Sequence, residues 1–121
     1  MKMYSEKHQW VELEGETARM GITEYAAKQL GDIVFVELPT IGDQVTGGDS
    51  IALVESVKSS SEIYTPVSGE ILRVNEQLTD TPEQLNGDPE GEAWIAELKV
   101  ANAEELDELM TEKEYLASLS N

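Results

Sequence analysis

The chain has 121 residues, with 25 Asp and Glu against 8 Lys and Arg, which gives a formal net charge of −17. Such acidity argues against nucleic acid or an anionic membrane as a partner, because both bind basic protein surfaces. The chain contains no cysteine, so any redox chemistry must come from an attached group, and no dense set of ligands predicts a metal site.

The length predicts one domain, residues 1–121, with C-terminal helices at about 102–119 packed on it. No apolar run is long enough to cross a bilayer, and the N-terminal MKMYSEKHQW lacks the apolar core of a signal peptide. We therefore expect a cytoplasmic protein, or one of the mitochondrial matrix if the sequence is a mature eukaryotic form.

The first half of the chain alternates short β-branched runs with turn residues. Residues 9–14 (QWVELE) and 17–22 (TARMGI) predict a hairpin. A short helix is expected next, with Thr23 as its N-cap and Gly31 as its stop. Further strands are expected at residues 32–39, 44–46, 50–56, 61–66, 69–75 and 93–100.

Helical signals are confined to short segments and to the C-terminus. Residues 81–87 (TPEQLNG) predict one helical turn capped by Thr81. Residues 102–121 predict one or two helices, with two pairs spaced as capping boxes: Asn102 with Glu105, and Thr111 with Glu114. Many short strands with helices at the edges, and no β-α-β alternation, indicate a mainly β antiparallel sandwich or small barrel.

One lysine stands alone in the acidic middle of the chain. Between Gln29 and Leu72, Lys58 is the only basic residue. Residues 42–57 and 61–74 resemble two arms of one folded-over motif, which would place Lys58 at the tip of the turn between them. The lysine is either an ordinary solvated side chain or one displayed for covalent modification. Its isolation and its small serine neighbours favour modification, but they do not name the group.

Residues 21–76, which include ESVK followed by SEIYTPVSGEI, closely resemble the H protein of the glycine cleavage system, a lipoyl-carrying subunit. The resemblance extends over nearly the whole chain. It implies a barrel-sandwich hybrid fold, the hammerhead shared by biotinyl and lipoyl carriers, with lipoate in amide linkage on Lys58. It also implies that Glu55 and Gly69 accompany modification, and we expect Gly69 to adopt a positive φ in its turn.

The resemblance further implies a carrier and not an enzyme. Such a carrier takes the aminomethyl group of glycine from the pyridoxal-phosphate glycine decarboxylase (P protein) to the aminomethyltransferase (T protein). It then passes reducing equivalents to dihydrolipoamide dehydrogenase (L protein), and a lipoyl-attaching enzyme loads it. Three alternatives stay open. One is an H-like lipoyl donor or relay in lipoate metabolism, and another, with less support, is a biotinyl carrier, whose usual Met-Lys-Met is Val-Lys-Ser here. The third is an acidic interaction module that has kept the fold without carrying a group.

In the family, a cleft on the carrier receives the loaded arm. Many members read His-Glu-Trp where this chain has His8, Gln9 and Trp10, and plant members have a histidine at the position of Gln29. Glu62 takes the place of a more usual aspartate four residues after the lysine. The resemblance thus implies Gln9, Gln29 and Glu62 as residues of the arm cleft.

Overall fold

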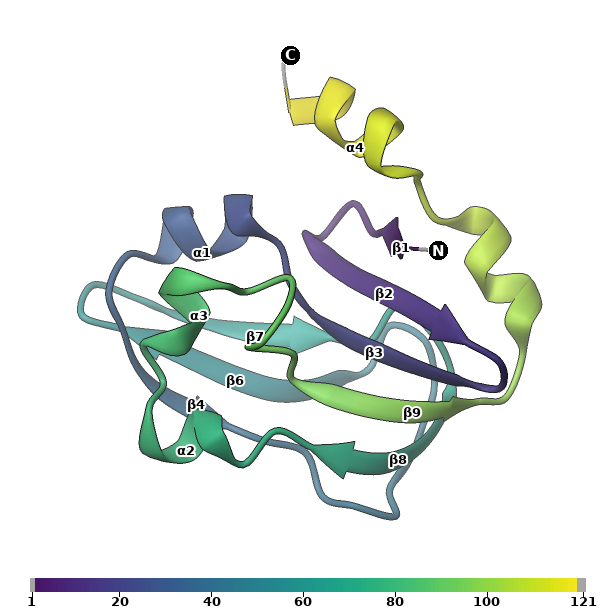
Figure 1. Cartoon of the computed structure of the whole chain (residues 1–121), viewed down its shortest axis with the longest axis horizontal. Coiled ribbons are helices and arrows are strands. Elements are labelled where there is room, and N and C mark those ends of the chain that lie inside the picture. Colours follow the sequence, from purple (N-terminus) through teal and green to yellow (C-terminus); the bar gives the residue numbers. More distant parts are fainter. Residues whose placement is uncertain (1, 120–121) are drawn as a thin grey trace.

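The computed structural model describes residues 2–119 as two antiparallel sheets with short helices at their margins (Figure 1). The larger sheet has the strand order β1-β2-β3-β9-β8-β5 and the smaller has the order β4-β6-β7. The strands are β1 Lys2–Tyr4, β2 Gln9–Glu14, β3 Thr17–Ile22, β4 Ile33–Glu37, β5 Gln44–Val45, β6 Ser50–Ser56, β7 Ser60–Tyr64, β8 Gly69–Val74 and β9 Ala96–Val100. The mainly β architecture expected from the sequence is confirmed.

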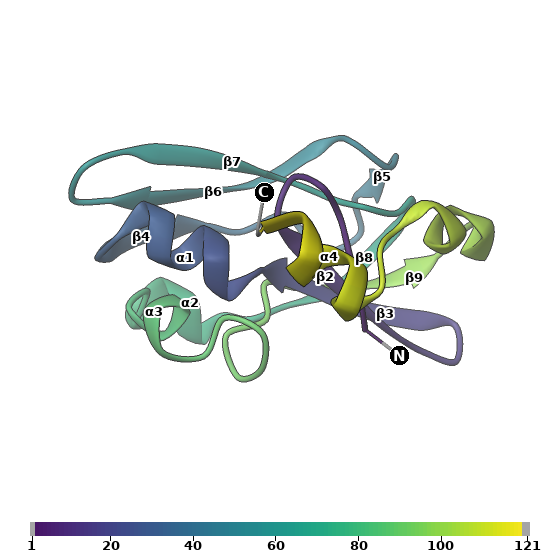
Figure 2. The same cartoon turned by 90° about the horizontal axis from the view of Figure 1, so that it is seen from above.

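Alternating side chains from both sheets form one core. On β6, Ala52 and Val54 are buried while Leu53 and Glu55 are more exposed, which is the period-two pattern of a strand with one face covered. Val54 packs in the same cluster as Met20 of β3 and Ile71 of β8, all with 0% exposure. The smaller sheet therefore turns its other face outward, and Figure 2 shows the helices away from that face.

The predicted hairpin and first helix are confirmed. β2 and β3 pair in register from Gln9 opposite Ile22 to Glu14 opposite Thr17. Helix α1, Glu24–Leu30, begins where the Thr23 side chain accepts a hydrogen bond from the Ala26 N–H (3.2 Å). It ends at Gly31, whose φ of 80° lies in the region that favours glycine.

The predicted cap at Thr81 is wrong. Two short helices lie here, α2 Gln77–Asp80 and α3 Gln84–Gly87, and the N-cap of α3 is Glu83, without a side-chain bond. The Thr81 hydroxyl instead donates to the carbonyl of Gln77 (2.8 Å). The Gln77 carbonyl also accepts from the Thr81 N–H (2.8 Å), because Thr81 is the C-cap of α2, a helical turn that the sequence did not indicate.

The C-terminal region forms a 3-10 helix, η1 Ala103–Glu108, and helix α4, Glu112–Leu119. The box at α4 is confirmed, since Thr111 N–H donates to the Glu114 carboxylate (3.0 Å) and Glu114 N–H to the Thr111 hydroxyl (3.2 Å). The other box forms only in part. Asn102 accepts from Glu104 N–H (3.1 Å), but Glu105 binds Ser68 instead. Within residues 2–119, no helix has the length and apolar content to span a bilayer.

Candidate modification site and adjoining groove

Lys58 lies at the tip of the β6–β7 hairpin, as the sequence predicted. The two strands pair up to Glu55 opposite Ser60, and the turn closes with a hydrogen bond from Ser56 N–H to the Ser59 carbonyl (2.8 Å). Figure 1 shows the hairpin projecting at one end of the molecule. The lysine is therefore displayed on a short, well-bonded turn.

A serine hydroxyl organises the turn from inside. Ser56 Oγ accepts from the N–H groups of Lys58 (3.3 Å) and Ser59 (3.1 Å) and donates to the Ser59 carbonyl (3.2 Å). Val57 N–H donates to the carbonyl of Asp32 (3.0 Å), in the connection between α1 and β4. These bonds fix the turn both internally and to the body of the protein.

The Lys58 side chain runs along the end of α1. A Cβ placed on Gly31 would lie 3.3 Å from Lys58 Cε, so the glycine leaves room for the stem. Lys58 is exposed, and among the described residues its Nζ has no hydrogen bond and no ion pair. The amine is free to react.

Glu55 and Gly69, the two residues expected to accompany modification, lie in different places relative to Lys58. Glu55 is on β6, paired with Ser60 next to the turn. Gly69 begins β8, beyond the far end of β7, at the opposite end of the molecule from the hairpin tip (Figure 1). The structure thus brings Glu55 but not Gly69 to the lysine.

The expected positive φ at Gly69 is wrong. Positive φ among the glycines occurs at Gly15, Gly31, Gly42 and Gly48. Gly69 is needed for a different reason, because a Cβ there would overlap the carbonyl oxygen of Lys99 on the neighbouring strand β9. The requirement is close approach of two backbones within the sheet.

A groove of about 310 Å³ adjoins the lysine turn. It lies between the start of β7 and helix α1, and it continues to the turn between β1 and β2. Its lining residues are Lys7, His8, Gln9, Ile22, Tyr25, Ala26, Gln29, Leu30, Ser59, Ser60, Ser61 and Ile63. A group attached at the hairpin tip would have this groove beside it.

Two of the three residues expected in the cleft line the groove. Gln29 is exposed on α1, whereas Gln9 is 4% exposed and its amide is used within its own turn. Gln9 Oε1 accepts from the Ser5 hydroxyl (2.7 Å) and Nε2 donates to the Lys7 carbonyl (3.0 Å). Glu62 does not line the groove, because its carboxylate accepts from Ser50 (3.2 Å) and Tyr64 (3.3 Å) on the outer face of the sheet.

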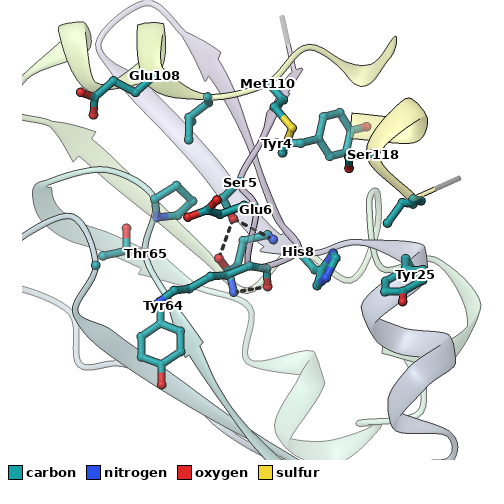
Figure 3. Close-up of a pocket in the computed structure, with 16 residues that line it drawn as sticks. Tyr4, Ser5, Glu6, His8, Tyr25, Tyr64, Thr65, Glu108, Met110 and Ser118 are labelled. Carbon is teal, nitrogen blue, oxygen red and sulfur yellow. Dashed lines mark hydrogen bonds between the residues drawn. The ribbon is translucent and has the colours of Figure 1, made fainter. Parts of the chain in front are cut away.

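A second hollow of about 760 Å³ shares Lys7, His8, Gln9 and Tyr25 with the groove. Figure 3 shows the β1–β2 turn between the end of β7 on one side and the C-terminal segment on the other. The Lys7 ammonium lies 4.4 Å from the centre of the Tyr64 ring, which links the turn to β7. The groove and the hollow therefore share the β1–β2 turn as a common wall, and the hollow extends to α4.

His8, the sole histidine, lines both the groove and the hollow. The sequence did not indicate this position. Its φ is 72°, and its Nδ1 lies 2.7 Å from the hydroxyl of Tyr115 on α4. The same hydroxyl lies 2.8 Å from Thr23 Oγ1. Burial lowers the pKa of His8 and raises the pKa of Tyr115, so at neutral pH the imidazole is neutral and the phenol keeps its proton. The two residues are 107 positions apart in sequence, and no local signal could have joined them.

The two-sheet fold with a lysine-bearing hairpin defines a carrier domain of the biotinyl and lipoyl class. The chain belongs to the glycine cleavage H-protein family, whose family model matches residues 2–121. This is a family of carrier proteins and not of enzymes.

Individual proteins agree with the family match. The chain is 53% identical over 112 residues to the glycine cleavage system H protein of Beijerinckia indica, covering 93% of this chain and 90% of that protein. It is 48% identical over 118 residues to that of Phenylobacterium zucineum, covering 98% of each. The crystal structure of a glycine cleavage system H protein from Mycobacterium marinum superposes with a TM-score of 0.90 at 34% identity, covering 99% of this chain and 97% of that one.

Proposed function

We propose that Lys58 carries lipoate in amide linkage and that the chain is the lipoyl carrier of a glycine cleavage system. The observation that supports this most directly is the free, exposed Lys58 amine at the tip of a bonded turn, beside a groove. The amide forms between Nζ and the lipoate carboxyl carbon. The lipoyl-attaching enzyme supplies lipoate as an activated acyl group. As the amide bond forms, the bond from the acyl carbon to the activating group breaks, that group leaves with the electron pair, and the attacking amine gives up a proton.

The residues present fit such a group. Gly31 leaves room for the lysine stem, and Ser59 to Ser61 line the groove without bulky side chains at its entrance. When bound, lipoate supplies a disulfide that can accept a one-carbon amine and two electrons. The chain itself supplies position, partner recognition and a sheltered surface, with Gln9 and Gln29 on the groove wall. Glu62, on the outer face, is proposed to act in partner recognition together with Glu55.

In this role the chain passes the aminomethyl group of glycine from glycine decarboxylase to the aminomethyltransferase. It passes the reducing equivalents to dihydrolipoamide dehydrogenase, in the cytoplasm of a bacterium. One exposed lysine must then meet several enzymes in turn, which requires encounters that are fast and short-lived. A surface rich in carboxylates suits that requirement.

A lipoyl donor or relay in lipoate metabolism would use the same lysine and the same hairpin. Supplying purified decarboxylase and aminomethyltransferase with the lipoylated chain separates the two roles, since a relay would not support glycine-dependent CO₂ release. A biotinyl carrier would differ in the mass of the adduct.

The test of the attachment site is intact mass after expression with lipoate, on the parent and on Lys58→Arg. We expect one lipoyl adduct on the parent and none on the variant, because arginine keeps the charge but offers no acylable amine at this position. Lys28→Arg is the matched control, since Lys28 is exposed in the last turn of α1. A lipoyl adduct that persists on Lys58→Arg would falsify the assignment.

A further inference from the structure

One hydroxyl group connects helix α4 to the wall of the groove that adjoins the lysine turn. Tyr115 is 2% exposed and is stacked on Tyr4, with ring centroids 4.9 Å apart and planes at 11°. Its hydroxyl is the only side-chain group of α4 with hydrogen bonds to both His8 and Thr23 among the described residues. Helix α4 is thereby joined to a residue that lines the groove adjoining the lysine turn.

The direction of these hydrogen bonds follows from counting hydrogens. Thr23 is completely buried, and its Oγ1 already accepts from Ala26 N–H. Its own hydrogen needs an acceptor, and among the described residues Tyr115 Oη is the one acceptor in reach (2.8 Å). Tyr115 then has a single hydrogen left, and it can go only to His8 Nδ1 (2.7 Å).

We propose that Tyr115 is a positioning residue: the hydrogen-bond chain from Thr23 through Tyr115 to His8 fixes the tautomer of the imidazole, with its hydrogen on Nε2, at the wall of the groove. A neutral histidine that accepts at Nδ1 must carry its proton on Nε2. Among the described residues Nε2 has no hydrogen-bond partner, so it is the nitrogen available to a ligand.

Charging the imidazole would disrupt this chain. A proton on Nδ1 would force the Tyr115 hydrogen back toward Thr23, and the buried Thr23 hydrogen would then have no acceptor. The groups facing the ring offer no compensation. The ring centroid of Tyr25 on α1 lies 4.7 Å from the imidazole centroid, and that of Tyr115 on α4 lies 5.7 Å from it. No described carboxylate forms an ion pair with the imidazole. In its own turn, Lys7 is a cation next to it in sequence, and Glu6 is a carboxylate that lines the same hollow without forming an ion pair with the ring.

This arrangement suits a groove that shelters an amine. A neutral imidazole carries no net charge, and its Nε2–H can donate to the lone pair of an unprotonated amine, although it cannot accept from a protonated one. The link to the arm rests on the proposed function, whereas the orientation of the hydrogen-bond chain does not.

The orientation can be tested directly by nitrogen NMR of the imidazole. His8 is the sole histidine, so a tag-free chain gives one unambiguous imidazole signal set. We expect a pyrrole-type Nε2 bearing hydrogen and a pyridine-type Nδ1 at pH 7. A hydrogen found on Nδ1 in the parent would overturn the proposal, and this measurement needs no variant to fold.

Tyr115→Phe removes the hydroxyl and keeps the ring that stacks on Tyr4. We expect the two tautomers to mix, because no hydroxyl then donates to Nδ1, while burial continues to hold the pKa of His8 below its ordinary value. Tyr4→Phe is the matched control, because it removes the hydroxyl of the other stacked ring, which donates to Glu90 (2.8 Å), and leaves the chain to His8 intact. A Tyr115→Phe protein with the parental tautomer would refute the positioning role.

The consequence for the arm is measured on lipoylated protein loaded with the aminomethyl group, with no other enzyme present. Spontaneous release of formaldehyde and ammonia should be several-fold faster in Tyr115→Phe than in Tyr4→Phe. Equal rates in the two variants would show that His8 does not hold the arm. A parent that accepts no lipoate would instead refute the proposed function and leave the NMR result unaffected.

Discussion

At the scale of single residues, the β1–β2 turn shows that a polar side chain on a groove wall can have a structural role of its own. Gln9 closes its turn with both ends of its amide, to Ser5 and to the Lys7 carbonyl. Its backbone N–H also donates to the Ser5 hydroxyl (3.1 Å). Gln9 is therefore a structural residue of the groove, with one of its two N–H donors and one of its two acceptor lone pairs already used within the turn.

Replacing Gln9 by glutamate should weaken this turn in a pH-dependent way. The carboxylate cannot donate to the Lys7 carbonyl (3.0 Å from the parental Nε2), so we expect the free energy of unfolding at pH 7 to fall by about 1 kcal/mol. The folded-state pKa of the new carboxyl should be raised, so the deficit should shrink as the pH falls toward 4 and the protonated acid regains a donor. Urea unfolding at both pH values measures the difference.

Gln44→Glu is the control for that experiment, since Gln44 is exposed and its side chain has no hydrogen bond among the described residues. It adds the same charge without breaking a bond. A Gln9→Glu deficit that matches the Gln44→Glu deficit, or that does not change with pH, would contradict the role given to the amide.

Gly69 leads to a separate prediction about the β8–β9 contact. Gly69→Ala should destabilise the protein by about 1–3 kcal/mol, because its Cβ meets the Lys99 backbone, which cannot move aside as a flexible side chain could. The protein that remains folded should be lipoylated on Lys58 at the parental rate, since Gly69 lies beyond the far end of β7. Chemical denaturation and a timed lipoylation assay measure the two effects. Slower lipoylation at unchanged stability would show that the attaching enzyme reads this position.

At the scale of elements, the 3-10 helix η1 is held by a side chain rather than by its own propensity. The Glu105 carboxylate accepts from Ser68 N–H (2.7 Å) and from the Ser68 hydroxyl (2.9 Å), and that hydroxyl also accepts from Gly47 N–H (2.8 Å). One carboxylate thus ties η1 to the loop that precedes β8. The bonds are charge-assisted and partly buried, which makes them stronger than ordinary surface contacts.

Glu105→Ala should therefore lower the free energy of unfolding by about 1.5–3 kcal/mol. Glu104→Ala in the same helix is the matched control, because Glu104 is exposed and its side chain makes no hydrogen bond among the described residues. Thermal or urea unfolding of both variants measures the effect. Equal losses would mean that the Ser68 contact contributes nothing beyond helix propensity.

The elements also show which features a sequence can reveal. The hairpin of Lys58, the caps of α1 and the box at Thr111 follow from residues within a few positions of one another, and local sequence predicted them. Gly69, Glu105 and Thr81 were assigned local roles, and in the structure each is explained by a neighbouring strand, loop or helix. The contact between His8 and Tyr115 crosses the whole chain, so only the fold could show it. The groove is likewise assembled from three separate segments, although two of its residues, Gln9 and Gln29, were expected from the family resemblance.

At the scale of the whole molecule, acidic side chains surround the lysine-bearing sheet. Direct pairing of Glu37 with Leu53, and of Leu53 with Glu62, places both carboxylates on the outer face of the smaller sheet. Glu55 and Phe35 are paired on the same face, where Phe35 is 44% exposed. This face offers an apolar centre with acidic neighbours to any enzyme that approaches Lys58.

Association with a partner should therefore depend on salt and on the location of the charge. We expect the association rate with glycine decarboxylase to fall as ionic strength rises, while the dissociation rate changes little, because screening acts on long-range attraction more than on bound contacts. The double variant Glu37→Gln/Glu62→Gln should associate more slowly and show a smaller salt dependence. Stopped-flow kinetics of the lipoylated carrier between low and physiological salt provides the measurement.

A matched double variant on η1 separates local steering from net charge. Glu104→Gln/Asp107→Asn removes the same number of charges from exposed positions on the 3-10 helix, which Figure 2 places at the opposite end of the molecule from the hairpin. Because the Debye length is about 8 Å at physiological salt, distant charges should contribute little to an encounter centred on Lys58. We expect this variant to keep nearly the parental rate and salt slope. If both double variants slow association equally, the net charge of −17 steers the protein as a whole; if neither does, the acidic residues serve solubility and the partners recognise the hairpin by contact alone.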